Sequence, residues 1–109
     1  DTLFAAGCGR LFEGSAENMF SSLHKINQLP PNTEIYCAHE YTLANLNFAV
    51  IAEPDNQETH KRQQQVSEMR ARGTATVPTT LELERLTNPF LRATTVAQLA
   101  ERRLQKDQF

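Results

Sequence analysis

The sequence predicts an α/β segment followed by a mostly α-helical region, and three observations favour this order. Residues 1–51 are apolar and contain glycines, whereas from Glu53 onward Gln, Glu, Arg, Lys and Thr dominate. Two short runs, Leu3–Phe4 and residues 34–38, have the length and composition of strands. Elsewhere apolar residues recur at the spacing of three or four that is typical of helices. We therefore expect a strand-loop-helix-strand unit followed by further helices.

Composition limits the classes of protein and partner. A chain of 109 residues with 39% hydrophobic residues is about one small domain. Its net charge of −2 and pI near 5.9 lack the clustered basic excess of a nucleic-acid-binding protein, so we expect no nucleic-acid partner. No signal peptide and no apolar run of about 18 residues is visible, so we expect no membrane partner. Two cysteines are too few for a disulfide framework, and reduced thiols in the cytoplasm are the default.

The first strand, at Leu3–Phe4, is expected to lead into a loop that contains three glycines. Ser15 is a good N-cap for the helix after this loop, and Pro30–Pro31 stops that helix. Its expected buried side consists of Met19, Phe20, Leu23 and Ile26. Residues 34–38 then form the second short strand.

Two helices are expected next. Thr42 can cap the first one, and Pro54 ends it. Its buried side is marked by Leu43, Leu46, Ala49 and Val50. Asn56 caps the second helix, which runs to about Arg72 before Gly73 as a natural C-cap. This helix is polar almost all round, as is typical of a helix packed by one edge. The residues that it can bury are Val66, Met69 and Ala71.

The last third begins with an extended linker at residues 74–80. Thr79 is expected to start a capping box for a short helix after the linker, and Thr95 caps the final helix. The expected inward face of this final helix consists of Val96, Leu99 and Leu104. Arg103 and Lys106 are expected to project from an adjacent face.

His39 directly follows the second predicted strand, where the loops of a sheet gather around ligands. Rigid backbone at that place would suit a metal ligand. A single histidine there is also typical of a surface or hydrogen-bonded structural residue, so position alone leaves both readings open. His24 and His60 have polar neighbours and are expected at the surface. Cys8, between two glycines and without a histidine nearby, is expected to be structural rather than nucleophilic.

Five segments change this balance, because they follow one another in the order of a known family. They are D-T-L-F at 1–4, G-C-G-R-L-F-E-G at 7–14, C-A-H-E-Y-T at 37–42, N-P-F-L-R at 88–92 and R-L-Q-K-D-Q-F at 103–109. With them the chain resembles glyoxalase II, the hydroxyacylglutathione hydrolases of the metallo-β-lactamase superfamily. The resemblance implies an αββα metallo-β-lactamase fold, of which residues 1–40 are the carboxyl-terminal remainder, and a helical substrate-binding domain at residues 41–109.

The resemblance also implies a site. Asp1 would bridge two divalent metal ions, and His39 would be the last metal histidine; Zn is the first choice, with Fe or Mn as alternatives. Two such ions would hold a shared water as hydroxide and polarise the substrate carbonyl. The residues that the resemblance assigns to glutathione are Arg10, Phe12, Tyr41, Arg103 and Lys106.

The chain departs from the family in two ways. Phe12 stands where relatives have Tyr and lacks its hydroxyl, while Arg10 replaces Lys and keeps the charge. The family's T-H-x-H-x-D-H motif is absent, and two ligands cannot hold two ions. We therefore expect the carboxyl-terminal part of a monomeric enzyme whose other metal ligands lie in an amino-terminal half. Alone, this chain is expected to bind metal weakly and to be inactive.

The implied reaction is hydrolysis of S-D-lactoylglutathione and similar 2-hydroxyacyl thioesters to glutathione and D-lactate, which completes methylglyoxal detoxification. A thiol with a pKa of about 8.5 leaves readily as thiolate, so little acid assistance is needed. One alternative is an iron persulfide dioxygenase, which iron content and oxygen consumption would distinguish. The helical appendage argues against a lactamase. Another alternative is a non-catalytic fragment or binding module, which intact mass would test.

Overall fold

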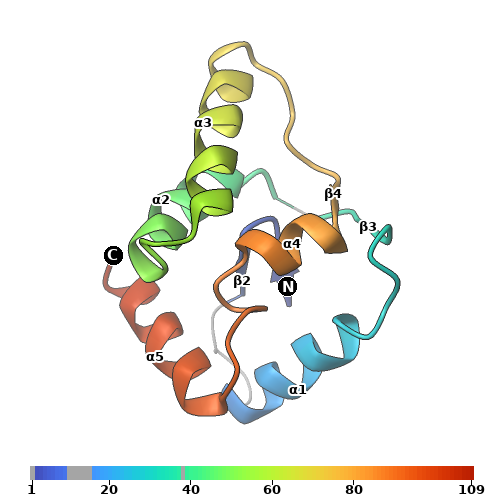
Figure 1. Cartoon of the computed structure of the whole chain (residues 1–109), viewed down its shortest axis with the longest axis vertical. Coiled ribbons are helices and arrows are strands. Elements are labelled where there is room, and N and C mark those ends of the chain that lie inside the picture. The colour runs from blue at the N-terminus through green and yellow to red at the C-terminus, as the bar shows by residue number, and fades with distance from the viewer. Residues whose placement is uncertain (1, 10–15, 38) are drawn as a thin grey trace.

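Helices dominate the computed structural model, which describes residues 2–9, 16–37 and 39–109 and measures 38 × 30 × 25 Å (Figure 1). In chain order the elements are β1 (Leu3–Phe4), β2 (Gly7–Cys8), α1 (Ala16–Ile26), β3 (Glu34–Ile35), α2 (Thr42–Ala52), α3 (Gln57–Ala71), β4 (Thr79–Thr80), α4 (Leu81–Thr87) and α5 (Val96–Asp107). The predicted order, strands and one helix before a run of helices, is confirmed in this coarse form. Expected features at Ser15 and Gly14 lie outside the described residues.

The strands form two small antiparallel pairs. In one, β1 pairs with β2, and Leu3 lies opposite Cys8. In the other, β3 pairs with β4, and Glu34 lies opposite Thr80. Two expectations are therefore wrong in extent: the second strand is only Glu34–Ile35, and Gly7 belongs to a strand rather than to a loop. The partner of β3 comes from more than 40 residues later, so no local pattern could set its length.

The helices surround two buried clusters and tie the ends of the chain together. Contacts join α1 to α5, α2 to α3 and to β2, and α3 to α4. The larger cluster comprises Cys8, Leu23, Phe48, Leu81, Phe90, Leu91, Ala93 and Leu99. The smaller one comprises Ala6, Leu46, Ala49 and Val66. Because the larger cluster contains Cys8 of β2 and the smaller one contains Ala6 of the turn before it, this hairpin shares a core with the helical region.

Helix ends follow local chemistry in most places. The Asn56 side chain accepts from the backbone N–H of Glu58, and the Thr95 side chain accepts from that of Gln98, so both predicted caps are confirmed. Gly73 has a φ of +73° just after α3, which fits its predicted role at the helix end.

Two predicted caps are wrong. Thr42 is the first residue of α2 rather than its cap, and Tyr41 holds the N-cap position without a side-chain bond. Thr80, not Thr79, caps α4 by accepting from the Leu83 N–H. The hydroxyls of Thr42 and Thr79 are instead engaged by side chains from distant segments, and those contacts decide which threonine caps.

The inward face of α5 also differs from the prediction. Leu99 is fully buried as expected, but Leu104 is 59% and Val96 36% exposed, whereas Arg103 is only 5% exposed. Arg103 is buried because its guanidinium finds hydrogen-bond acceptors inside, which apolar periodicity does not reveal. In α3, Val66 is buried as predicted, but Ala71 is exposed. Among the described residues, no helix is both long and apolar enough to cross a membrane.

Candidate functional site

The predicted metal histidine lies in a cluster of three rings. His39 stacks on Tyr41, with ring centroids 4.8 Å apart and planes 8° apart. The ring of Phe4 meets both edge-on, at 5.8 Å from His39 and 5.6 Å from Tyr41. Phe4 is buried, whereas His39 is exposed and Tyr41 is 49% exposed. The buried ring of β1 therefore supports two exposed rings that can meet a ligand.

The alternate residues of the same segment are anchored elsewhere. The backbone N–H of Thr76 donates to Glu40 at 2.8 Å, and the Thr76 hydroxyl contacts both the Glu40 carboxylate and the Thr42 hydroxyl. Arg70 lies 3.9 Å from Glu40. Desolvation raises the pKa of Glu40, but the Thr76 bonds and the Arg70 charge outweigh it, so this pKa is lowered. Two kinds of contact thus hold residues 39–42. His39 and Tyr41 pack against the ring of Phe4, while Glu40 and Thr42 are bound by Thr76.

The ring nitrogens of His39 are available to bind a metal. Among the described residues its ring nitrogens have no hydrogen-bond partner, so a lone pair remains available. Asp1 lies outside the described residues, but Phe4, three residues later, contacts His39. Within residues 2–9, 16–37 and 39–109 no group of three or more His, Cys, Asp or Glu could hold a metal ion. These residues therefore supply one described donor, not a complete centre.

The turn between β1 and β2 carries Phe4 and is itself fully buried. Ala5 and Ala6 are 1% and 0% exposed, and Ala6 has a φ of +61°. A non-glycine residue in this left-handed region costs about 1–2 kcal/mol, so surrounding contacts must hold it. A Cβ on Gly7 would lie 2.6 Å from the Asn45 side-chain amide, which explains the glycine. The turn is therefore held in a conformation that its own residues do not favour.

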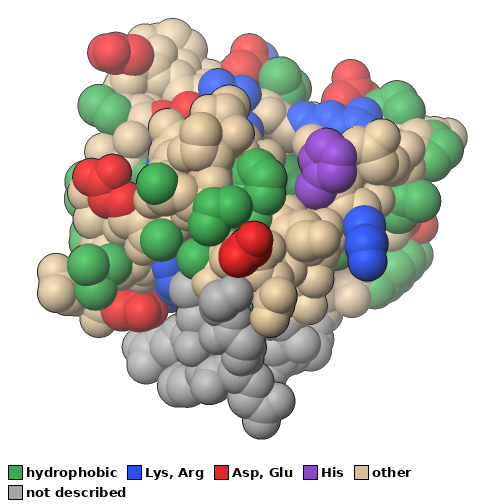
Figure 2. Space-filling view, turned by 90° about the horizontal axis from the view of Figure 1, so that it is seen from below, with side chains coloured by type: hydrophobic (Ala, Val, Ile, Leu, Met, Phe, Trp, Pro, Cys, Tyr) green, Lys and Arg blue, Asp and Glu red, His purple; other side chains and the backbone are tan. Residues whose placement is uncertain are grey.

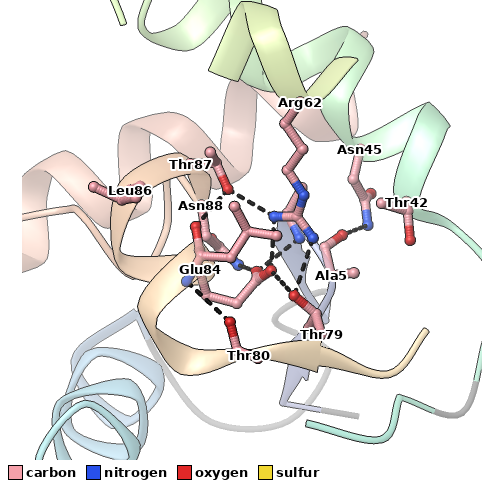
Figure 3. Close-up of polar contacts among 12 residues, drawn as sticks. Ala5, Thr42, Asn45, Arg62, Thr79, Thr80, Glu84, Leu86, Thr87 and Asn88 are labelled. Atoms are coloured by element: carbon pink, nitrogen blue, oxygen red, sulfur yellow. Dashed lines mark hydrogen bonds and ion pairs between the residues drawn. The ribbon is translucent and has the colours of Figure 1, made fainter. Parts of the chain in front are cut away.

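Two amides bind the carbonyls of this turn. Asn45 Nδ2 donates to Ala5 O at 3.1 Å, and Asn88 Nδ2 donates to Gly7 O at 3.0 Å and to Phe4 O at 3.3 Å (Figure 3). Asn45 comes from α2, and Asn88 follows α4 directly. Residues from α2 and from the end of α4 thus hydrogen-bond to the backbone around Phe4, whose ring packs against His39.

A buried carboxylate binds the same turn through its N–H. Glu84, fully buried on α4, accepts from Ala6 N at 2.8 Å and from Asn88 Nδ2 at 2.9 Å through Oε1. Its Oε2 accepts from Arg62 Nη1 at 2.7 Å and from the Thr79 hydroxyl at 2.9 Å. Four donors around one carboxylate satisfy the charge despite complete burial.

The network around Glu84 was not predicted from the sequence. Arg62 is 4% exposed and also donates to the Thr87 hydroxyl at 2.6 Å. One signal was available: Thr59, Arg62 and Val66 follow one another at spacings of three and four, which places them on one face of α3. All three are buried. The polar helix therefore turns an arginine, rather than only its few apolar residues, toward the core.

Arg103, predicted to contact substrate from the surface, is directed inward. Its Nη1 donates to Cys8 O at 2.7 Å, its Nη2 lies 2.8 Å from the Asp107 carboxylate, and its guanidinium lies 5.2 Å from the Phe90 ring centre. Burial raises the pKa of the Cys8 thiol to about 11, with Arg103 acting in the opposite direction. A thiol that stays protonated is a poor nucleophile, which agrees with a structural Cys8.

The other predicted substrate residues divide into two groups. Arg10 and Phe12 lie outside the described residues, while Lys106 is partly exposed on the turn of α5 that follows Arg103. Gly9, adjacent to Arg10, has its carbonyl 3.5 Å from Arg103 Nη1. The structure therefore places Arg103 beside Cys8 and Gly9, and Tyr41 beside His39.

The other histidines and the underside of the molecule offer weaker candidates. His24 and His60 are exposed, as predicted. His60 lies 2.7 Å from the carbonyl of Pro54. Figure 2 shows hydrophobic side chains gathered in the middle of the underside, with charged groups around them. A cavity of about 60 Å³ between α1 and residues 90–93 includes His24 and Asn27 in its lining, and it is smaller than a typical ligand site.

Comparison with known proteins identifies relatives. The family model described as hydroxyacylglutathione hydrolase C-terminus matches residues 40–109. The chain is 55% identical over 109 residues to hydroxyacylglutathione hydrolase of Pseudomonas fluorescens, a match that covers 98% of this chain and 43% of that protein. The protein of the same name from Aliivibrio salmonicida is 53% identical over the same shares, and that of a Synechococcus strain is 50% identical over 100% and 47%. The chain therefore spans less than half the length of these relatives.

Proposed function

Since this chain belongs to the hydroxyacylglutathione hydrolase C-terminus family, we propose that it forms the carboxyl-terminal part of a metal-dependent thioester hydrolase. The proposed substrate is S-D-lactoylglutathione or a similar 2-hydroxyacyl glutathione thioester, and the products are glutathione and D-lactate. Residues 1–40 would complete a metallo-β-lactamase-like domain, and residues 41–109 would bind substrate. A small, mostly helical unit with few strands is compatible with this division.

The observation that carries the proposal is the ring cluster of His39, Tyr41 and Phe4. An exposed imidazole with uncommitted nitrogens packs against both the stacked ring of Tyr41 and the buried ring of Phe4, which also contact each other. Of the cluster, Tyr41 lies within the family match, which begins at residue 40, and His39 directly precedes it. Anchoring of Glu40 and Thr42 limits movement of the backbone on either side of Tyr41. This arrangement supports a donor that is fixed in advance of binding.

The donor set fits a divalent metal. His39, and Asp1 by resemblance to the family, would hold metal together with ligands outside this chain. When bound, such ions would activate water and polarise the thioester carbonyl. This chain's own contribution would be to orient the imidazole, because Tyr41 covers one face of the His39 ring and Phe4 blocks its edge.

The substrate's tripeptide would lie on polar and aromatic groups beside this donor. Tyr41 is half-exposed next to His39 and would contact the tripeptide through its ring or hydroxyl. Arg10, Phe12 and Lys106 are proposed contacts. Arg103, which binds the carbonyls of Cys8 and Gly9, would act mainly by holding the loop that precedes Arg10.

A chimera tests this function. Residues 1–109 of this chain would replace the matching 43% of the Pseudomonas fluorescens relative. We expect the chimera to hydrolyse S-D-lactoylglutathione, measured as loss of thioester absorbance, and the same chimera with His39→Ala to be inactive and depleted of metal. The 109-residue chain alone should bind zinc weakly and show no turnover. A folded chimera that retains full metal content but has no thioesterase activity would contradict the proposal.

A further inference from the structure

The two oxygens of Glu84 face different parts of the molecule. Oε2 faces Arg62 and Thr79 (Figure 3). Oε1 accepts from the N–H of Ala6 in the β1–β2 turn. Ala6 is the turn residue with a positive φ. The acceptor from α4 therefore acts at the residue of the turn that is least stable on its own.

The turn, Ala5–Ala6, directly follows Phe4, the last residue of β1. Phe4 contacts His39 and Tyr41 through its ring. The backbone of Ala5, inside the turn, lies close enough to the Cys37 thiol, two residues before His39, to oppose the rise in the pKa of that thiol that burial causes. A shift of the turn would therefore move both the ring beneath His39 and the chain that leads to it.

We propose that Glu84 is a positioning residue. Its Oε1 holds the turn at Ala6, and the turn in its place holds the ring of Phe4 against the His39 imidazole. Arg62 fixes the carboxylate from the other side. The consequence for catalysis rests on the proposed function, whereas the effect on the position of His39 does not.

The composition of the network favours a positional role over a stabilising one. A buried ion pair contributes little more to stability than apolar groups of the same size. Among the described residues, Arg62 Nε and the Thr59 hydroxyl are buried without a hydrogen-bond partner. A core filled only for stability would not leave these atoms unpaired. What an apolar filling cannot supply is the acceptor for Ala6 N–H.

Two double variants separate acceptor from charge. Arg62→Met with Glu84→Gln removes both charges but keeps an amide oxygen for Ala6, and the amide nitrogen can donate to Thr79 or Thr87. Arg62→Met with Glu84→Met removes the acceptor as well. Both are neutral and similar in volume, so they differ in the hydrogen bonds of residue 84: those from Ala6 N–H and Asn88 Nδ2, and the one shared with Thr79.

The readout is NMR of the 109-residue chain. We expect the stacked Tyr41 ring to shift the ring protons of His39, and the variants His24→Gln and His60→Gln identify which signals belong to His39. We expect the Gln double variant to keep the His39 shifts and slow exchange of the Ala6 amide. In the Met double variant the His39 shifts should move toward those of an exposed histidine, and Ala6 exchange should accelerate at least about tenfold.

Either of two results overturns the proposal. One is unchanged His39 shifts in the Met double variant. The other is loss of these shifts in a folded Gln double variant, because an acceptor would then not suffice. If the double variants do not fold, Glu84→Asp decides: it keeps both charges but withdraws the oxygen, so Ala6 exchange should accelerate and the His39 shifts should move. Unchanged values in a folded Glu84→Asp variant also overturn the proposal.

The chimera adds a catalytic readout. In it, the Met double variant should lower kcat about 10–100-fold, as outer-shell substitutions at metal sites do, with little change in KM. The Gln double variant should stay near the unsubstituted chimera. If the unsubstituted chimera is inactive, the proposed function fails, while the NMR comparison still decides the role of Glu84.

Discussion

The segment 39–42 and the Arg62–Glu84 network differ in how the chain builds them. The first is contiguous and exposes His39 and Tyr41 to a ligand. The second joins residues 22 apart in sequence and is almost entirely buried. The exposed segment holds the groups that can touch a substrate, whereas the buried network touches only backbone and other side chains. Substrate contact and structural support therefore lie in different regions. Variants in the first region should change activity, and variants in the second should change stability.

The largest expected effect is functional. His39→Ala in the chimera should abolish turnover and weaken metal binding by more than about 100-fold, since outer-shell changes alone cost 10–100-fold. Because His39 is exposed, the free energy of unfolding should change by less than about 0.5 kcal/mol. Metal analysis and urea unfolding measure the two quantities. A large loss of stability would erase the contrast between the two regions.

Breaking the buried pair should act in the opposite way. Arg62→Ala leaves Glu84 with an uncompensated buried charge, so the free energy of unfolding should fall by about 3–5 kcal/mol. Urea unfolding of the 109-residue chain measures this. The control is Arg70→Ala, which removes a half-exposed partner 3.9 Å from Glu40 and should cost at most about 1 kcal/mol. Equal losses for the two arginines would show that burial does not set the difference.

Lys106→Ala tests a proposed substrate contact on α5, outside both regions. A cation that grips the unreacting tripeptide acts equally in ground and transition states, so KM should rise several-fold while kcat changes little. Steady-state kinetics of the chimera on lactoylglutathione measure both constants. A fall in kcat at constant KM would instead place Lys106 close to the reacting atoms.

The smallest effect concerns Glu40 and pH. Its pKa is lowered in the folded chain from an ordinary value of 4.5, so its bonds to Thr76 stabilise the fold above that value. This contribution, less than about 1 kcal/mol for a partly exposed group, is lost as pH falls below 4.5 through the folded pKa. The stability gap between the wild-type chain and Glu40→Gln should therefore close over that range. A gap independent of pH would rule out the carboxylate as its source.

Sequence reasoning succeeded where the decisive contacts are local. The caps at Asn56 and Thr95 depend on residues two and three positions away, and both are confirmed. The motif around His39 is contiguous, and the family to which it pointed is shown by the comparisons. The site roles of all the predicted residues remain predictions, and Asp1, Arg10 and Phe12 also lie outside the described part of the chain.

It failed where distant segments decide. Thr80 caps α4 instead of Thr79, because the Thr79 hydroxyl accepts from Arg62 Nη2, 17 residues earlier, and donates to Glu84. Arg103 was expected at the surface and Leu104 in the core, and the structure shows the reverse. Hydrophobic spacing cannot show that the carbonyl of Cys8, 95 residues away, accepts a hydrogen bond from Arg103. Buried charge is invisible to a pattern that counts only apolar residues.

The bonds from Arg103 to Cys8 and from Glu84 to Ala6 set a limit on how this molecule can be recombined. A crossover at residue 40, the edge of the family match, would pair the hairpin of one parent with helices that evolved around another. The helical part should therefore be transferable between relatives only together with its own residues 2–9. In recombination between relatives, the hairpin and the helices that bind it should therefore be exchanged as a single unit.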